Sequence, residues 1–597
     1  MLREEADWPD TCVRAYDTDH ITTKETGSDS GGLPPAAALG VVAALSVALS
    51  ACGGGGGGGG GYSPPPPPPP PPALQYTVTE AARFLLQAQF AFTDADVTSV
   101  RTLGYSAWLD QQFSVSLSQT AQAWLDGQGH NVPKANGNYF DPTMGDWMAW
   151  RVTMTGADQL RKRCALALSE MMVTSLNPID GFWPPYVIGA YWDLLNKDAF
   201  GNFRTLLEDI TLNASMGLFL NTRGNIKEDP ATGREPDENY AREVMQLFTI
   251  GLYELNLDGT DKTDGLGNKT ETYTQDDISN LAHVFTGYDW NYSRVTWQNT
   301  PFLPYAIPTT EFARDPMSFD ASKHSDLAVT FLGTTIPANT PGAAALKTAL
   351  DTLFNHPNVG PFFAKQMIQR LVTSNPSPAY VARVAGAFNN NGSGVRGDLK
   401  AVWKAILTDT EARTLPTDDK SGKLREPMIR WIQWARLFNV SSDTGLWQIY
   451  DTSGSDWGLG QSPLRSPSVF NYFRPGYVPP HTAIADAADV APEFQLHNET
   501  TTAGYINFLT STIRTGYSDV KPNHAEALAL VTDSQGLLDW LNLHFSANQI
   551  SATTIAAMKT ALDTHAVGAG SSDSEKLDRI CNAVLMVMSC PEYLIQK

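Results

Sequence analysis

The sequence predicts a mainly α-helical protein: a multi-helical globular body with long loops and at most short peripheral strands. From Tyr76 onward, apolar residues recur at spacings of three and four positions, which is the period of an amphipathic helix. Strand-type alternation over five or more residues is rare. The chain has 597 residues, 42% of them hydrophobic, so it carries enough apolar surface for more than one core.

The chain divides by composition into three regions. We expect a leader over residues 1–52, a disordered tether over 53–75 and a helical domain over 76–597. Within the helical domain, the stretch 389–397 is rich in Asn and Gly and marks a point where two packed subdomains could separate.

The leader ends like a bacterial lipoprotein signal peptide. Its apolar run PAAALGVVAALSVALSAC is shorter than the roughly 20 residues of a transmembrane helix and has the length of a signal-peptide core. Small residues before Cys52 resemble a lipobox, in which the peptidase cuts and the Cys thiol carries lipid. A buried core helix is the other interpretation, but a core helix is not normally followed by a glycine tract. The sequence therefore predicts lipidation at Cys52.

Low-complexity sequence follows this cysteine. Nine glycines, Gly53–Gly61, form a flexible coil, and nine prolines, Pro64–Pro72, favour an extended polyproline II rod. Together they would hold the body away from a membrane. We expect a lipid-anchored protein of the bacterial cell envelope that faces the periplasm or the exterior. Outer-membrane sorting is favoured where that membrane exists, because Gly53 and not Asp follows the lipidated residue.

The charge balance bears on partners. The chain has 42 basic and 63 acidic residues, a formal net charge of −21, so its field repels nucleic acid and anionic lipid headgroups. We expect no nucleic-acid partner, and contact with the membrane only through the anchor at Cys52.

Two local signals place helix starts in the polar middle of the chain. Thr274 stands three residues before Asp277, the spacing of a capping box. Pro236 suits a first helical position, and the following Asp237 and Glu238 suit the positive end of a helix dipole. We therefore predict one helix beginning at Thr274 and another opening at Glu235.

The helix opening at Glu235 carries the densest polar pattern. On a 3.6-residue period one stripe contains Glu235, Asn239, Arg242, Glu243 and Gln246. Asn239, Arg242 and Glu243 could bind an anionic or sugar-like ligand, or they could form a buried ion-pair network between helices. In either case we expect Arg242 and Glu243 to face the interior or a cleft, with Asp277 and His356 as partners.

A second candidate binding segment is SPLRSPSVFNYFRPGY. It places Arg465 and Arg474 among four aromatic residues in a short, turn-rich stretch. Arginines and aromatics together can form a saccharide or anion platform, and they can equally pin a loop to a helical core by stacking. The sequence leaves both interpretations open.

Several long motifs, in order, carry a family resemblance. They include RKRCALALSEMMVTS, REPDENYAREVMQLFTIGLYEL, TYTQDDISNLAHVFTGYDW, LREPMIRW and SPLRSPSVFNYFRPGY. From about Glu80 to Gln596 the chain resembles the bacterial family catalogued as domain of unknown function 1800. The resemblance implies an exported, mostly helical protein, often encoded beside a sulfatase-like partner. It implies no established activity, and the cofactor remains unknown.

Hydrolase and metal-site motifs are missing from the sequence. It contains no GxSxG and no HExxH. No two of the available ligands stand in a His-x-x-x-His or Glu-x-x-His register, so we predict no metal site; these ligands are Glu238, Glu243, Asp277, His324 and His356. Glu243, His324 and His356 remain candidates for a carboxylate/His catalytic site. We therefore expect a binding or assembly component of the envelope. The alternative is an envelope hydrolase or transferase that acts on a polymer through those three residues.

Overall fold

Helices dominate the computed structural model, which describes residues 74–418 and 421–597. The predicted leader 1–52, the lipidation site Cys52 and nearly all of the tether 53–75 lie outside the described residues. The helical body belongs to one compact unit that continues to Lys597. No helix in the described part is long and apolar enough to cross a bilayer.

The first six helices build one side of the core. They are α1 (Val78–Ala88), α2 (Asp94–Leu103), α3 (Tyr105–Phe113), α4 (Ala121–Gly127), α5 (Thr143–Thr155) and α6 (Gln159–Ser169). A capping box between Thr77 and Glu80 starts α1, and the same motif between Thr93 and Asp96 starts α2.

The middle of the chain is organised around one long helix, α7, against which α4, α5, α6, α8 and α9 pack. The helical segments here are α7 (Pro184–Asp198), α8 (Phe203–Thr211), α9 (Ala214–Phe219), α10 (Asn239–Glu243), η2 (Val244–Thr249), α11 (Gln275–Val284), α12 (Glu311–Arg314) and η3 (Ala321–Lys323).

The next helices form a stack in which α14 packs on α15 and α15 packs on α16. Their bounds are α13 (Gly342–Asn355), α14 (Val359–Leu371), α15 (Pro378–Asn389), α16 (Leu399–Thr408), α17 (Thr410–Arg413) and α18 (Pro427–Leu437). The stretch 389–397 is the turn between α15 and α16, where the side chain of Asn390 accepts hydrogen bonds from the backbone of Gly392 and Gly394.

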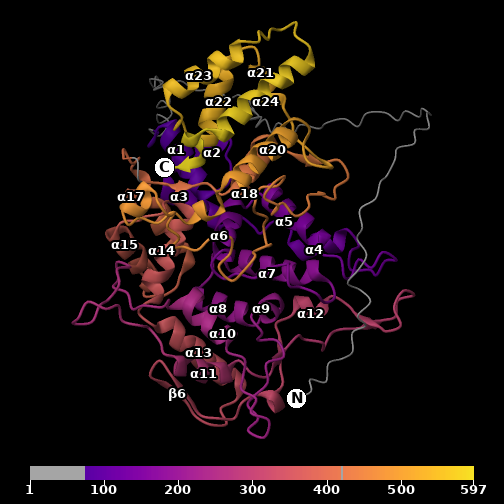
Figure 1. Ribbon diagram of the computed structural model, residues 1–597, viewed down its shortest axis with the longest axis vertical. Coiled ribbons are helices and arrows are strands. Elements are labelled where there is room, and N and C mark those ends of the chain that lie inside the picture. Colours follow the sequence, from indigo (N-terminus) through magenta and orange to yellow (C-terminus); the bar gives the residue numbers. More distant parts are fainter. Residues whose placement is uncertain (1–73, 419–420) are drawn as a thin grey trace, which may run out of the picture. The chain divides into compact units, whose positions relative to one another are not determined.

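The C-terminal helical segments are α19 (Ala483–Asp486), η4 (Pro492–Leu496), α20 (Glu499–Thr515), α21 (Ala525–Leu530), α22 (Ser534–Ser546), α23 (Ala552–Asp563), α24 (Asp573–Ser589) and α25 (Pro591–Leu594). Of these, α21 to α24 lie at one end of the body, shown in yellow in Figure 1, and α22 contacts α1. Helix α18 contacts both α5 and α22, and so connects the C-terminal helices to the first helices. There Trp150 and Trp431 meet edge to face with ring centroids 4.8 Å apart.

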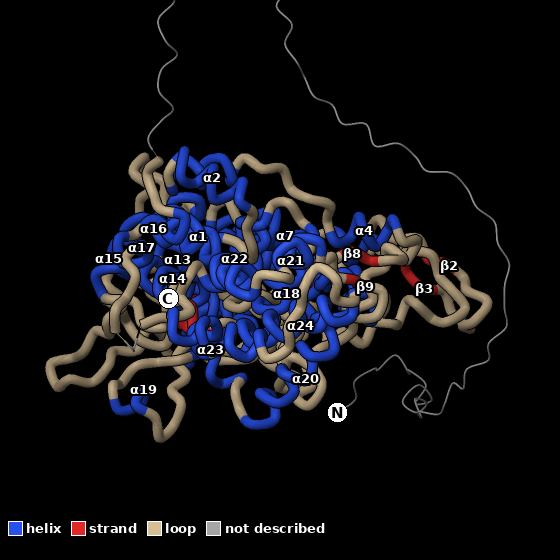
Figure 2. Tube along the Cα trace, turned by 90° about the horizontal axis from the view of Figure 1, so that it is seen from above, coloured by secondary structure: helices blue, strands red, loops and turns tan. Residues whose placement is uncertain are grey.

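Strands are few and short, coloured red in Figure 2. They form five antiparallel pairs: β1 (Tyr288–Asp289) with β4 (Ser318–Phe319), β2 (Trp297–Gln298) with β3 (Ile307–Pro308), β5 (Val329–Phe331) with β6 (Thr334–Ile336), β7 (Lys423–Leu424) with β10 (Ile595–Gln596), and β8 (Ser441–Ser442) with β9 (Val520–Lys521). The mainly α fold is thus confirmed. Both residues of β3 and both residues of β7 are buried.

One helix start is confirmed and the other is wrong. The capping box between Thr274 and Asp277 opens α11. The helix predicted to open at Glu235 begins instead at Asn239. The side chain of Asn225 accepts a 2.9 Å hydrogen bond from the backbone N–H of Asp237 and donates a 3.2 Å hydrogen bond to the carbonyl oxygen of the same residue. These two bonds hold Asp237 outside the helix. After Glu243 the backbone widens into the π-helix η2, so the 3.6-residue period behind the predicted stripe does not continue to Gln246.

Candidate functional site

Arg242 lies on the surface between α10 and α11. Its side chain is 39% exposed and one of its nitrogens lies 3.1 Å from Glu238 and 3.2 Å from Gln275. Glu238 also accepts hydrogen bonds from Gln275 and Ser279 of α11. The predicted pairing of Arg242 with Asp277 or His356 is wrong, because this partly exposed side chain contacts Glu238 and Gln275 instead.

Glu243 is buried, as predicted, but within the described residues no hydrogen bond or ion pair joins it to another helix. It is 8% exposed and its Oε2 has no hydrogen-bond partner. Burial raises the pKa of Glu243, and the charge of the adjacent Arg242 only partly opposes that. The predicted partner Asp277 is used elsewhere: it caps α11 and accepts a 2.7 Å hydrogen bond from the backbone of Leu332.

The two candidate histidines have local roles. His324 is buried and its Nδ1 lies 2.9 Å from the carbonyl oxygen of Thr286. His356 ends α13, and its Nδ1 accepts a 3.2 Å hydrogen bond from the backbone of Asn358. Burial lowers the pKa of His356. Among the described residues, no contact joins His324 or His356 to Glu243.

Arg465 and Arg474 play different parts. Arg465 forms a two-pronged ion pair with Asp146 of α5, at 2.8 and 2.7 Å, and a third contact at 3.0 Å with Asn177. Arg474 stacks over the ring of Phe470 at 4.5 Å. Arg465 therefore ties its loop to the helical core, while Arg474 stays at the surface of that loop.

The most concentrated charge lies elsewhere, in a buried ionic cluster of five residues from five segments. They are Glu170 after α6, Arg370 in α14, Lys423 in β7, Glu426 before α18 and Glu493 in η4, each 4% exposed or less. Lys423 pairs with Glu493 at 2.9 Å, and Arg370 lies 3.6 Å from Glu170. The cluster therefore joins segments that are far apart in the sequence.

Within the buried ionic cluster, Glu170 and Glu426 form a carboxyl pair. The two side chains are close enough for the charge of Glu426 to act on Glu170, and Gln461 donates a 2.7 Å hydrogen bond to Glu426. Burial, and then the charge of Glu426, raise the pKa of Glu170 well above its usual range. The buried neighbouring carboxylate therefore disfavours the charged form of Glu170.

A cavity of about 10 Å³ adjoins this pair, close to the space that one water molecule needs. Glu170, Ser462, Asn471 and Tyr472 are among its lining residues. Both carboxyl oxygens of Glu170, Oγ of Ser462 and Nδ2 of Asn471 have no hydrogen-bond partner from the protein. These donors and acceptors suit a water held against the carboxyl pair.

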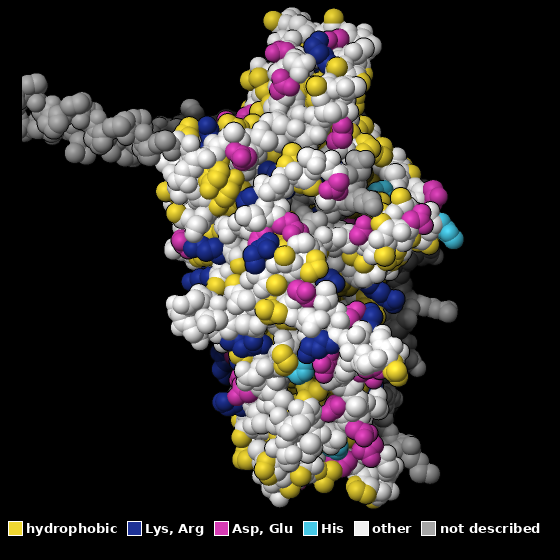
Figure 3. Space-filling view, turned by 90° about the vertical axis from the view of Figure 1, so that its left-hand side faces the viewer, with side chains coloured by type: hydrophobic (Ala, Val, Ile, Leu, Met, Phe, Trp, Pro, Cys, Tyr) yellow, Lys and Arg dark blue, Asp and Glu magenta, His cyan; other side chains and the backbone are white. Residues whose placement is uncertain are grey.

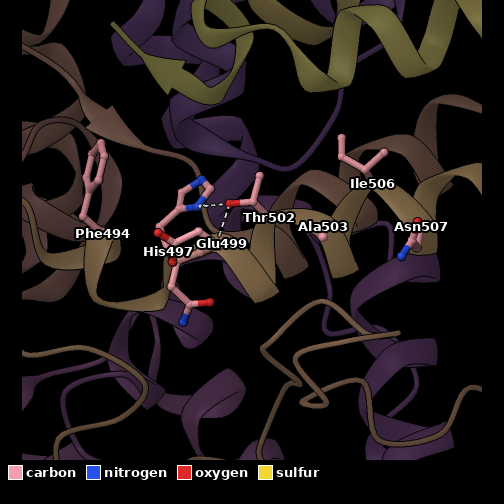
Figure 4. A pocket seen from close by; sticks show the side chains of 8 residues that line it. Phe494, His497, Glu499, Thr502, Ala503, Ile506 and Asn507 are labelled. Atoms are coloured by element: carbon pink, nitrogen blue, oxygen red, sulfur yellow. Dashed lines mark hydrogen bonds between the residues drawn. The ribbon is translucent and has the colours of Figure 1, made fainter.

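On the outer side of η4 lies an open groove of about 880 Å³ (Figure 4). Phe494, His497, Thr502 and Ile506 are among the residues that line it, and His497 Nδ1 lies 2.9 Å from Thr502 Oγ1. Burial, and then the charge of Arg430, lower the pKa of His497. Because η4 also carries Glu493, the groove and the buried ionic cluster share one short segment.

Sequence reasoning missed the buried ionic cluster, although a signal was present. Glu170 and Arg370 stand beside mainly apolar residues at the ends of their helices, in CALALSE and MIQRL. A charge inside an apolar helix is tolerated when it is paired, so these positions predict buried partners. The identity of the partners depends on packing between distant segments.

Metal ligands do not assemble in residues 74–418 and 421–597: no three His, Cys, Asp or Glu side chains there form a group that could hold a metal ion. On the face seen in Figure 3, acidic and basic side chains are interspersed.

Comparison with known proteins identifies the family. No curated protein and no solved structure matches the chain. One family model, described as a protein of unknown function (DUF1800), matches residues 83–595, which is nearly the whole helical body. The protein therefore belongs to the DUF1800 family.

Proposed function

We propose that this protein is a lipid-anchored component of the bacterial cell envelope whose helical body binds or assembles with other envelope molecules. The observation that carries this proposal is that charged side chains inside the body are paired with one another, whereas one groove on the surface is open. Arg465, Arg370 and Lys423 are each paired inside the body. The groove beside η4 is instead open, and aromatic, aliphatic, amide and hydroxyl side chains line most of it, together with His497 and Glu499, a mixture that suits recognition of a partner.

The proposed location in the cell envelope rests on Cys52 and the Gly/Pro tether. An acylated Cys52 would hold the protein at a membrane, since each buried methylene contributes about 0.8 kcal/mol. The outer membrane is the favoured membrane. The partner would be the sulfatase-like envelope protein implied by the family. The net charge of −21 disfavours nucleic acid as a partner.

Fractionation of cells tests the proposed membrane location. Cys52→Ala should move the protein out of the membrane fraction or stall its processing, whereas Cys12→Ala should leave it there, because Cys12 lies within the predicted leader. Wild-type protein found soluble in the cytoplasm with Met1 retained would contradict the proposal.

The groove provides the test of binding. Ile506→Asp places a charge in the groove and should weaken the complex with the purified sulfatase-like neighbour at least tenfold. Leu528→Asp makes the same kind of change at a 42% exposed position on α21, outside the lining of the groove, and should have no effect. Equal binding by all three proteins would argue against the groove as the contact surface.

An envelope hydrolase or transferase acting on a polymer is the second candidate, and one observation favours it. The carboxyl pair of Glu170 and Glu426 adjoins the water-sized cavity, an arrangement that could supply general acid–base chemistry if the cluster opened to substrate. Glu170→Gln should then abolish release of sugars from isolated cell walls, while Glu243→Gln tests the site predicted from the sequence.

A further inference from the structure

We propose that the β2–β3 hairpin and the residues flanking it bind an uncharged polysaccharide. We call residues 290–310 the aromatic arm. The arm lies at the edge of the body (Figure 2) and displays Trp297, Phe302, Tyr305 and Tyr292, which are 55%, 49%, 37% and 37% exposed. Exposed apolar side chains gathered on one surface mark interaction sites, because they gain nothing from contact with water.

The exposed rings are held in place by a ladder of aromatic contacts. Buried Trp290 contacts buried Phe312 with ring centroids 4.7 Å apart, and Phe312 stacks on Tyr292 at 5.9 Å. Tyr292 in turn stacks on Trp297 at 5.9 Å, with an angle of 22° between the rings. The outermost ring is thus ordered before any ligand arrives, which lowers the entropy cost of binding.

The arm is also fixed to the body. Trp183 donates a 2.7 Å hydrogen bond to the carbonyl oxygen of Pro308 in β3, whose residues are buried. β2 pairs only with β3, so Trp297 stands on the outer strand. The platform is therefore a rigid and accessible edge of the fold.

Uncharged polar groups surround the rings. The only charged residue of the arm is Arg294, and it is neutralised by two contacts with Asp315 at 2.5 and 2.7 Å. The exposed or half-exposed polar neighbours are Asn291, Ser293, Thr296, Gln298 and Asn299. Amide and hydroxyl groups can exchange hydrogen bonds with sugar hydroxyls while the flat rings cover the C–H face of a sugar.

A charged pair completes the rim beside Tyr292. Arg223 lies 3.7 Å above the ring of Trp290 and 3.2 Å from Asp289, and both side chains are partly exposed. Arginine and aspartate side by side can bind neighbouring hydroxyls of one sugar ring as donor and acceptor.

The charge of the chain argues for an uncharged ligand. A net charge of −21 repels polyanions, and the aromatic arm offers no unpaired cation to attract anionic lipid headgroups. The inference rests on the proposed function in one respect: a protein located in the cell envelope would meet the polysaccharides found there.

Affinity electrophoresis of the purified full-length chain tests this inference. Gels containing hydroxyethyl cellulose, galactomannan or glycol chitin serve as uncharged probes, and a polyuronate gel is the anionic probe. At least one uncharged probe should retard the wild type, and Trp297→Ala should raise the dissociation constant at least tenfold, with partial recovery in Trp297→Phe. Trp457→Ala is the matched control, since Trp457 is 72% exposed and lies outside the aromatic arm.

A fluorescence measurement covers the case in which Trp297→Ala fails to fold. In Trp457→Ala, Trp297 is the remaining exposed tryptophan among the described residues, and a bound oligosaccharide of the retarding type should shield it from acrylamide. The inference is overturned if no uncharged probe retards the wild type, if Trp297→Ala binds normally, or if only polyuronate or phosphatidylcholine vesicles bind. These assays use purified protein, so a failure to bind polysaccharide would not contradict lipid anchoring at Cys52. A loss of the proposed anchor would likewise not contradict polysaccharide binding.

Discussion

Arg465 holds Asp146 through two parallel contacts of 2.8 and 2.7 Å, and thereby joins the loop after β8 to α5. The side chain of Asp146 is only 4% exposed. Burial raises the pKa of Asp146, and Arg465 opposes that shift. An arginine engaged in this way has little left to offer a ligand, which favours the structural interpretation of this segment.

Arg465→Ala should therefore destabilise the fold. It leaves the buried carboxylate of Asp146 without its counter-charge, a change that costs about 3 to 5 kcal/mol. Arg474→Ala is the control from the same segment, because an exposed stacking contact contributes about 0.5 to 1 kcal/mol. Urea unfolding curves separate the two. If Arg465→Ala unfolds at the wild-type midpoint but loses a bound anion or saccharide, Arg465 is a ligand-binding residue instead.

Local signals explain what the sequence could predict. The capping box of Thr274 and Asp277 acts within four residues, so α11 could be located without knowledge of the fold. The same holds for the helical spacing that predicts the mainly α body. These features need no partner from elsewhere in the chain.

Long-range packing explains what the sequence could not predict. Glu170 meets Glu426, and Lys423 meets Glu493, only because α6, α18 and η4 converge in the folded body. The π-helix η2 follows Glu243 and shifts the side chains after it, which no 3.6-residue pattern reveals. The candidate site was therefore the part of the molecule least accessible to sequence reasoning.

Arg242 and Glu243 should respond differently to substitution. Arg242→Ala removes a half-exposed ion pair with Glu238 and should change the free energy of unfolding by about 0 to 1 kcal/mol. Glu243→Gln should keep or raise stability at neutral pH, because it removes a buried carboxyl group whose charged form is disfavoured. Denaturant midpoints measure both. Unfolding of both variants at a lower denaturant concentration than the wild type would instead support the buried ion-pair network predicted from the sequence.

The carboxyl pair of Glu170 and Glu426 should make stability depend on pH. The pKa of Glu170 is raised in the folded state, whereas in the unfolded chain it returns to about 4.3. Above that value the folded protein binds more protons than the unfolded chain. The contribution of the pair is therefore fully present below the unfolded pKa and is lost as pH rises through the folded pKa.

Glu170→Gln isolates this effect, because the amide can donate to Glu426 without a titrating proton. Its free energy of unfolding should fall less than that of the wild type as pH rises from about 5 to about 9, and each pKa unit of difference corresponds to about 1.4 kcal/mol. Glu499→Gln, at an exposed carboxyl group of α20, should keep the wild-type slope. Guanidinium midpoints across this pH range give the slopes, and an infrared carbonyl band of a protonated carboxylic acid that disappears in Glu170→Gln would identify the proton directly. Parallel slopes in all three proteins would mean that Arg370 and Lys423 keep Glu170 charged and would contradict this prediction.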